Sequence, residues 1–113
     1  MTLEVDLPFL PPPELRGNSR NAHWSVRHRK ARARRDAVAV RLRELPELPD
    51  PLWEAVIITY HVRYCGKPID RDNLIMGMKP ALDALKGEVI LEDSPEVVRH
   101  IDVTYTPVAR VDI

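Results

Sequence analysis

The chain has 113 residues, of which 44% are hydrophobic and 30% charged, a composition typical of one small globular domain, to which we assign residues 1–113. No apolar run approaches the roughly 20 residues that a membrane-spanning helix requires, and the acidic start does not resemble a signal peptide, so we expect a cytoplasmic protein with no membrane partner. The formal net charge is zero, and Cys65 is the single cysteine, which excludes an internal disulfide and a cysteine metal cluster.

The first predicted elements are a strand over residues 3–9 and a helix over about residues 25–45. In the strand, Leu3, Val5 and Leu7 alternate with acidic residues, and a run of three prolines closes it. In the helix, apolar residues recur at the spacing of one face, and several prolines follow its end. We expect the buried face to consist of Trp24, His28, Ala31, Val38, Leu42 and Leu45.

The predicted helix and the loop before it carry a strongly basic block. From Arg16 to Arg43 there are ten basic residues and one acid, Asp36, so the rest of the chain is acidic. Acidic partners at i,i+4 spacing are nearly absent, which favours a surface that binds a polyanion over an ordinary solvated helix face. The residues expected to contact nucleic-acid phosphates are Arg16, Arg20, Arg27, Lys30, Arg32, Arg34 and Arg35.

A strand over residues 55–64 is the clearest element, because Val56, Ile58, Tyr60 and Val62 alternate with a mixed set of residues. One wholly apolar side and one mixed side indicate a central strand. The helical segment over about residues 71–86 contains an internal proline, so we expect a kink or two short helices that meet near Gly77. Strands over residues 89–91 and 97–105 complete the order β-α-β-α-β-β. The prediction is an α+β fold, with a mixed sheet of about four strands and two helices packed on it.

Acidic residues gather in the stretch that follows the predicted central strand. In an extended backbone Asp70 and Asp72 point to the same side, and two carboxylates at that spacing suit Mg²⁺, which prefers oxygen ligands. Glu92 and Asp93 follow the short strand at residues 89–91 and could bring a third carboxylate to the same place. Lys79 could approach it and stabilise negative charge in a phosphoryl transition state. Either aspartate of the pair could instead cap the helix that begins nearby.

These residues, in this order, also resemble a known family. The segments are Asp70-Arg71-Asp72-Asn73-Leu74, then Met78-Lys79-Pro80-Ala81-Leu82-Asp83-Ala84-Leu85-Lys86-Gly87, then Val89-Ile90-Leu91-Glu92-Asp93-Ser94. Together they are similar to the RusA-type Holliday junction resolvases, the endodeoxyribonuclease RusA family. The run from Asn18 to Trp24 that enters the basic helix resembles phage and prophage members of that family.

The resemblance implies a homodimer that binds four-way DNA junctions and makes paired nicks with Mg²⁺, for which Mn²⁺ can substitute, in a bacterial or phage-infected cell. Carried over by position, Asp70, Asp72 and Asp93 would hold the metal, and Lys79 would assist the chemistry. The matching positions that we expect to support the site are Asn73, Asp83 and Glu92.

Two other functions stay open on the sequence. The chain could be a DNA-binding protein without catalysis, which would bind with a steep salt dependence and never nick. It could also be a related nuclease that acts on flaps, forks or single strands. The four histidines lack a metal-ligand spacing, and the absence of a glycine-rich phosphate loop leads us to expect no nucleotide cofactor.

Overall fold

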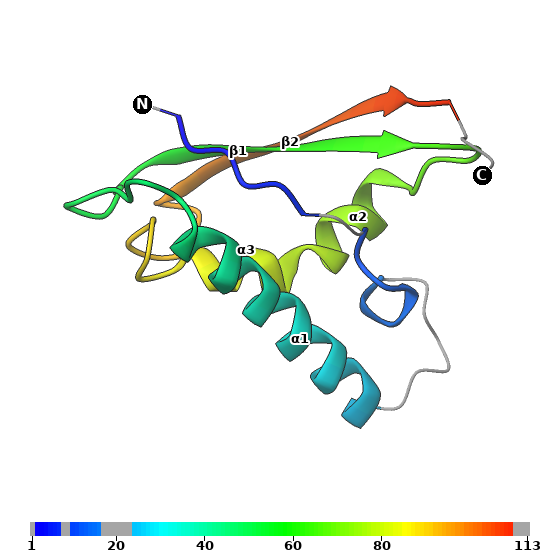
Figure 1. Ribbon diagram of the computed structural model, residues 1–113, viewed down its shortest axis with the longest axis horizontal. Coiled ribbons are helices and arrows are strands. Elements are labelled where there is room, and N and C mark those ends of the chain that lie inside the picture. Colours follow the sequence, from blue (N-terminus) through cyan, green and yellow to red (C-terminus); the bar gives the residue numbers. More distant parts are fainter. Residues whose placement is uncertain (1, 8–9, 17–23, 110–113) are drawn as a thin grey trace.

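Two long parallel strands form the sheet, and the helices pack against one of its faces (Figure 1). This computed structural model describes residues 2–7, 10–16 and 24–109. The described elements follow the order η1, α1, β1, α2, α3, β2, where η1 is a short 3-10 helix at Pro13–Leu15. The α+β class is as expected, but the described residues contain a sheet of two strands rather than the mixed sheet of about four.

The two strands are β1, Val56–Tyr64, and β2, Val98–Pro107. Their register places Ile58 opposite Ile101 and Val62 opposite Tyr105. Side chains of β1 alternate between the covered and the open face, as the sequence predicts, and Val62 is the most deeply buried of them. The prediction of a central position for β1 is wrong for the described residues, because β2 is its single strand neighbour.

The N-terminal segment accounts for one missing strand. In residues 2–7, Leu3, Val5 and Leu7 are half-buried against the core and alternate with exposed residues, as predicted, but their backbone forms no strand. These three side chains line a cleft of about 190 Å³ together with residues of β1 and α3, and the segment stays outside the hydrogen-bonded ladder. The rest of the predicted element, residues 8–9, lies outside the described residues.

The predicted strand at residues 89–91 is also absent. Ile90 forms isolated bridges with Trp53 and Lys86 instead, and the Trp53 N–H donates to the Val89 carbonyl oxygen at 2.9 Å. A turn at Gly87, with φ 83°, precedes this segment. Because only single residues of the segment form bridges, it does not add a strand to the sheet.

Helix α1, Trp24–Arg43, is buried along one row at four-residue spacing, Arg34, Val38 and Leu42. Packing against η1 and α3 selects this row. The predicted face is therefore wrong at its N-terminal end, where Trp24 is 72% exposed and His28 is exposed as well.

The predicted break in the second helical segment is confirmed. Helix α2, Arg71–Gly77, and helix α3, Lys79–Leu85, meet at Met78. Pro80 lies in the first turn of α3, where its missing N–H leaves no helical bond unmade. A Cβ on Gly77 would lie 2.8 Å from the Cβ of Pro11, so the end of α2 needs a glycine to let the N-terminal segment approach.

The core lies between the covered face of the sheet and the helices. Its most deeply buried side chains come from α1, α2 and the segment after α3, and they are Leu42, Leu74 and Ile90. The loop after β1 and the start of α2 lie beside β2, and the candidate site is located there.

Candidate functional site

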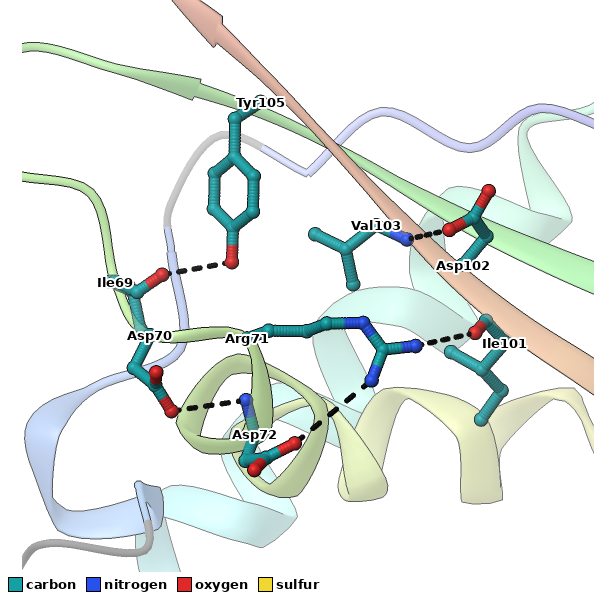
Figure 2. Close-up of polar contacts among 8 residues, drawn as sticks. All are labelled: Ile69, Asp70, Arg71, Asp72, Ile101, Asp102, Val103 and Tyr105. Atoms are coloured by element: carbon teal, nitrogen blue, oxygen red, sulfur yellow. Dashed lines mark hydrogen bonds and ion pairs between the residues drawn. The ribbon is translucent and has the colours of Figure 1, made fainter.

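The acidic turn, residues 69–72, lies where the chain enters α2 (Figure 2). Asp70 is the N-cap residue of α2, and its Oδ2 accepts a hydrogen bond from the backbone N–H of Asp72 at 3.2 Å. The Leu74 N–H donates to the carbonyl oxygen of Asp70 at 2.9 Å. Asp70 thus adopts the capping role that the sequence left open, while both carboxylates stay exposed to solvent.

The acidic turn contacts β2 through two hydrogen bonds (Figure 2). Tyr105 Oη donates to the carbonyl oxygen of Ile69 at 2.9 Å, and Arg71 Nη2 donates to the carbonyl oxygen of Ile101 at 3.1 Å. The other terminal nitrogen of Arg71, Nη1, is 3.9 Å from Asp72 Oδ1. One arginine therefore contacts both the strand and an aspartate of the turn.

Two further contacts order this part of β2. The Val103 N–H donates to Oδ1 of Asp102 at 2.9 Å. The ring of Tyr105 packs edge-on against the ring of Tyr64 from β1, with centroids 6.2 Å apart and planes at 79°. The hydroxyl of Tyr105 is thus held by a ring that is itself packed.

A second cluster, the Lys79 cluster, lies at the start of α3. Lys79 Nζ is 2.7 Å from Asp93 Oδ2 and 3.2 Å from Asp83 Oδ1, one helical turn later. The hydrogen bond to Asp93 and the contact with Asp83 raise the pKa of Lys79, and the same hydrogen bond lowers the pKa of Asp93. Burial raises the pKa of Tyr60 on β1 to about 12, and the charge of Lys79 opposes that rise.

The predicted residues therefore fall into two groups. Asp70 and Asp72 lie in the acidic turn, and Asp93 is paired with Lys79. Across the described residues, no three His, Cys, Asp or Glu side chains are placed to hold a metal ion. Of the two remaining supporting positions, Asn73 is half-buried and Glu92 is exposed.

The acidic turn has the donor chemistry that Mg²⁺ requires. Mg²⁺ retains several waters and is commonly held by one or two carboxylates together with substrate phosphates. Asp70 and Asp72 supply two exposed carboxylates of this kind, although Asp72 lies in the first turn of α2 rather than in the extended backbone expected for this pair. Asp93, the third predicted ligand, is paired with Lys79 and is not grouped with these two carboxylates among the described residues.

The basic block is divided between two sides of α1. Arg29, Arg32 and Arg35 are exposed, and none of them forms an ion pair within the described part of the chain. Arg27 is exposed too and Lys30 is half-buried. Arg29, Arg32 and Arg35 therefore present positive charge to solvent, with no ion pair to an acid of the described residues.

Two other predicted phosphate-binding residues are turned toward the protein. Arg34 is 9% exposed, its Nη2 lies 3.6 Å from the sulfur of Met78, and its Nε has no hydrogen-bond partner. Burial lowers the pKa of this guanidinium. Arg16 is half-buried and its Nε donates to the carbonyl oxygen of Pro11 at 3.0 Å. Arg20 lies outside the described residues.

Sequence reasoning missed two residues that the structure places at these clusters. The sequence places Tyr105 only within the predicted strand over residues 97–105, and Arg71 only between Asp70 and Asp72. The partner of Tyr105 is a backbone carbonyl oxygen 36 residues away, and side-chain patterns carry no signal for such a bond.

Among the described helices, none combines the length and the apolar character needed to span a membrane. A scan of the chain against protein-family models gave no match, and searches of curated proteins and of solved structures gave none either.

Proposed function

We propose that the protein is a magnesium-dependent endonuclease that resolves four-way DNA junctions by paired nicks, in the cytoplasm of a bacterial or phage-infected cell. The proposal starts from the resemblance of its acidic and lysine motifs to the RusA-type resolvases. The observation that carries it is the 2.7 Å contact between Lys79 Nζ and Asp93 Oδ2. That contact joins two motif residues that are 14 positions apart.

In this proposal Asp70 and Asp72 of the acidic turn, together with Asp93, would hold the metal. Mg²⁺ would supply an activated water and would neutralise charge on the attacked phosphate. Lys79 then places its ammonium group against the negative charge that develops on the phosphate oxygens. The ordinary pKa of a lysine, about 10.4, already leaves that group positively charged at neutral pH.

DNA is bound by the exposed arginines of α1, because unpaired guanidinium groups attract phosphates and release counterions. The relevant side chains are Arg29, Arg32 and Arg35. A homodimer would present two equal sites to the two equal strands of a four-way junction, which suits paired nicking.

One observation favours a second candidate, a DNA-binding protein without catalysis. Among the described residues the three aspartates Asp70, Asp72 and Asp93 do not converge on one metal position. In that case the aspartates would have structural roles, which Asp70 already has as the cap of α2.

A nicking assay separates the two candidates. A synthetic four-way junction and a matched linear duplex are incubated with wild-type protein, with and without Mg²⁺, beside Asp72→Asn. We expect paired, Mg²⁺-dependent cuts in the junction alone, absence of cuts with the variant, and unchanged junction binding. The matched control is Asp102→Asn, an exposed aspartate on β2 outside the acidic turn, which should cut like the wild type. Tight junction binding without cuts in Mg²⁺ or Mn²⁺ would support the second candidate.

A further inference from the structure

The acidic turn is attached to β2 at two points. Tyr105 binds the carbonyl oxygen of Ile69, one residue before Asp70, at 2.9 Å. Arg71, which lies between the two aspartates, binds the carbonyl oxygen of Ile101 at 3.1 Å. Ile101 and Tyr105 are four residues apart on one strand, so the two attachments span roughly 13 Å along β2.

The residues before the turn offer little other support. Residues 65–68 follow β1 without regular structure and are exposed. Tyr105, by contrast, is half-buried, pairs with Val62 across the ladder and packs its ring against Tyr64. Because the ring is packed, its hydroxyl has a fixed position, and the hydrogen bond to Ile69 restrains the backbone of the turn relative to the sheet.

Arg71 acts from the other side of Asp70. Its guanidinium spans the space between the Ile101 carbonyl oxygen, at 3.1 Å, and the Asp72 carboxylate, at 3.9 Å (Figure 2). A planar guanidinium that contacts two groups restricts the orientation of both. The carboxylate of Asp72 is otherwise almost fully exposed, and its side chain is 89% accessible to solvent.

We propose that Tyr105 is a positioning residue for the Asp70–Asp72 pair, and that Arg71 shares this role from within the turn. The inference rests on the proposed function, in which the carboxylates of Asp70 and Asp72 are metal ligands. Residues behind a metal ligand commonly have this effect, and their replacement typically lowers metal affinity by a factor of about 10 to 100.

The test measures binding of Mn²⁺ alone to the full chain by calorimetry, well below the melting temperature. Tyr105→Phe removes one hydroxyl and keeps the ring pair, and we expect the Kd for Mn²⁺ to rise about tenfold. Amide exchange at Leu74, whose N–H binds the Asp70 carbonyl oxygen, should be faster in the same variant. In the nicking assay, saturating metal should restore most of the rate, because the ligands themselves are intact.

The matched control is Tyr64→Phe, the same chemical change in the neighbouring ring, whose hydroxyl makes no hydrogen bond to another described residue. It should leave the Kd for Mn²⁺ and the exchange of Leu74 unchanged. Arg71→Lys provides a second route if Tyr105→Phe does not fold, since Arg71 is exposed and lysine keeps the charge but lacks the planar group that contacts both Ile101 and Asp72, so Mn²⁺ binding should also weaken.

The outcomes separate this inference from the proposed function. A wild type that binds Mn²⁺ and nicks junctions, with a Tyr105→Phe variant of equal Kd, would overturn the positioning role and leave the nuclease standing. A variant with a lower melting temperature but normal Kd and normal Leu74 exchange would show a purely structural tyrosine. A wild type that neither binds Mn²⁺ nor nicks would overturn both.

Discussion

Lys79 Nζ lies 2.7 Å from Asp93 Oδ2, and this ion pair should make stability depend on pH at both ends of the range. The lowered pKa of Asp93 gives one contribution to the free energy of unfolding. It is present above the ordinary aspartate pKa of about 3.9 and is lost as pH falls through the pKa of Asp93 in the folded state. The raised pKa of Lys79 gives a second contribution to the free energy of unfolding. It is present below the ordinary lysine pKa of about 10.4 and is lost as pH rises through the pKa of Lys79 in the folded state.

Lys79→Met should therefore lower stability at pH 7 by about 0.5 kcal/mol, the amount typical of exposed ion pairs. The difference from the wild type should shrink in acid as Asp93 becomes protonated. Melting temperatures measured between pH 2 and pH 9 check this. Lys86→Met, a change at an exposed lysine that forms no ion pair among the described residues, should show no such trend.

Arg34→Met should stabilise the protein. The guanidinium is buried against Met78, its Nε has no hydrogen-bond partner, and no carboxylate pairs with it within the described residues. A methionine would keep the apolar packing of the inner part of the side chain without the desolvation penalty of the guanidinium, which gives a gain of about 1 kcal/mol. Urea unfolding measures it.

The control for that change is Arg35→Met, one residue along the helix and exposed, which should alter stability by less than about 0.5 kcal/mol. A loss of stability in Arg34→Met would mean that the guanidinium makes a favourable interaction after all, and the account of its burial would be wrong.

Arg32→Ala and Arg35→Ala should each weaken junction binding at low salt and reduce the slope of log K against log salt by about 1. Both side chains are exposed on α1 and unpaired within the described residues. Fluorescence anisotropy at several salt concentrations gives the slope. Arg99→Ala, at an arginine on β2 whose Nε donates to the Glu96 carbonyl oxygen, serves as the control. Equal slopes for all three variants would exclude α1 from the DNA interface.

Gly77→Ala should destabilise the protein by about 1 to 3 kcal/mol, although alanine is the better helix former. The new Cβ would lie 2.8 Å from the Cβ of Pro11 and 2.9 Å from its Cγ. Pro11→Gly removes both atoms, so the double variant should lose less stability than the sum of the two single variants. Additive losses would show that the contact with Pro11 is not the cause.

The sequence predicts those parts of the fold that depend on local rules. Strand β1 follows from its alternation, and the break at Met78 follows from the proline in the next turn. The predictions of strands at residues 3–9 and 89–91 failed, because a strand also requires hydrogen bonds to a partner strand. Leu3, Val5 and Leu7 alternate correctly, yet they pack only through their side chains.

The buried face of α1 shows the same limit. Arginine and lysine occupy five of the first eleven residues of this helix, so the apolar pattern there is too sparse to define a face. Contacts with η1 and α3 decide it instead, and they bury Arg34 while Trp24 stays exposed.

The candidate site was predictable in its residue types and not in its grouping. The acids and Lys79 follow from motif spacing. The grouping of the carboxylates depends on the path of the segment after α3. That segment returns to the start of α3 and brings Asp93 to Lys79. The roles of Tyr105 and Arg71 depend on backbone carbonyl oxygens, which have no trace in a side-chain pattern.

Arg71 and Asp102 also determine what β2 can join. The Val108 N–H reaches the Tyr64 carbonyl oxygen across the ladder, so the alternate residues Ile101 and Val103 direct their backbone groups to the outer edge of the strand. The Arg71 side chain binds the carbonyl oxygen of Ile101, and the Asp102 side chain binds the N–H of Val103. Both backbone groups are therefore occupied, which closes the middle of that edge to another strand. In the proposed homodimer the second subunit would therefore have to attach away from this edge of β2.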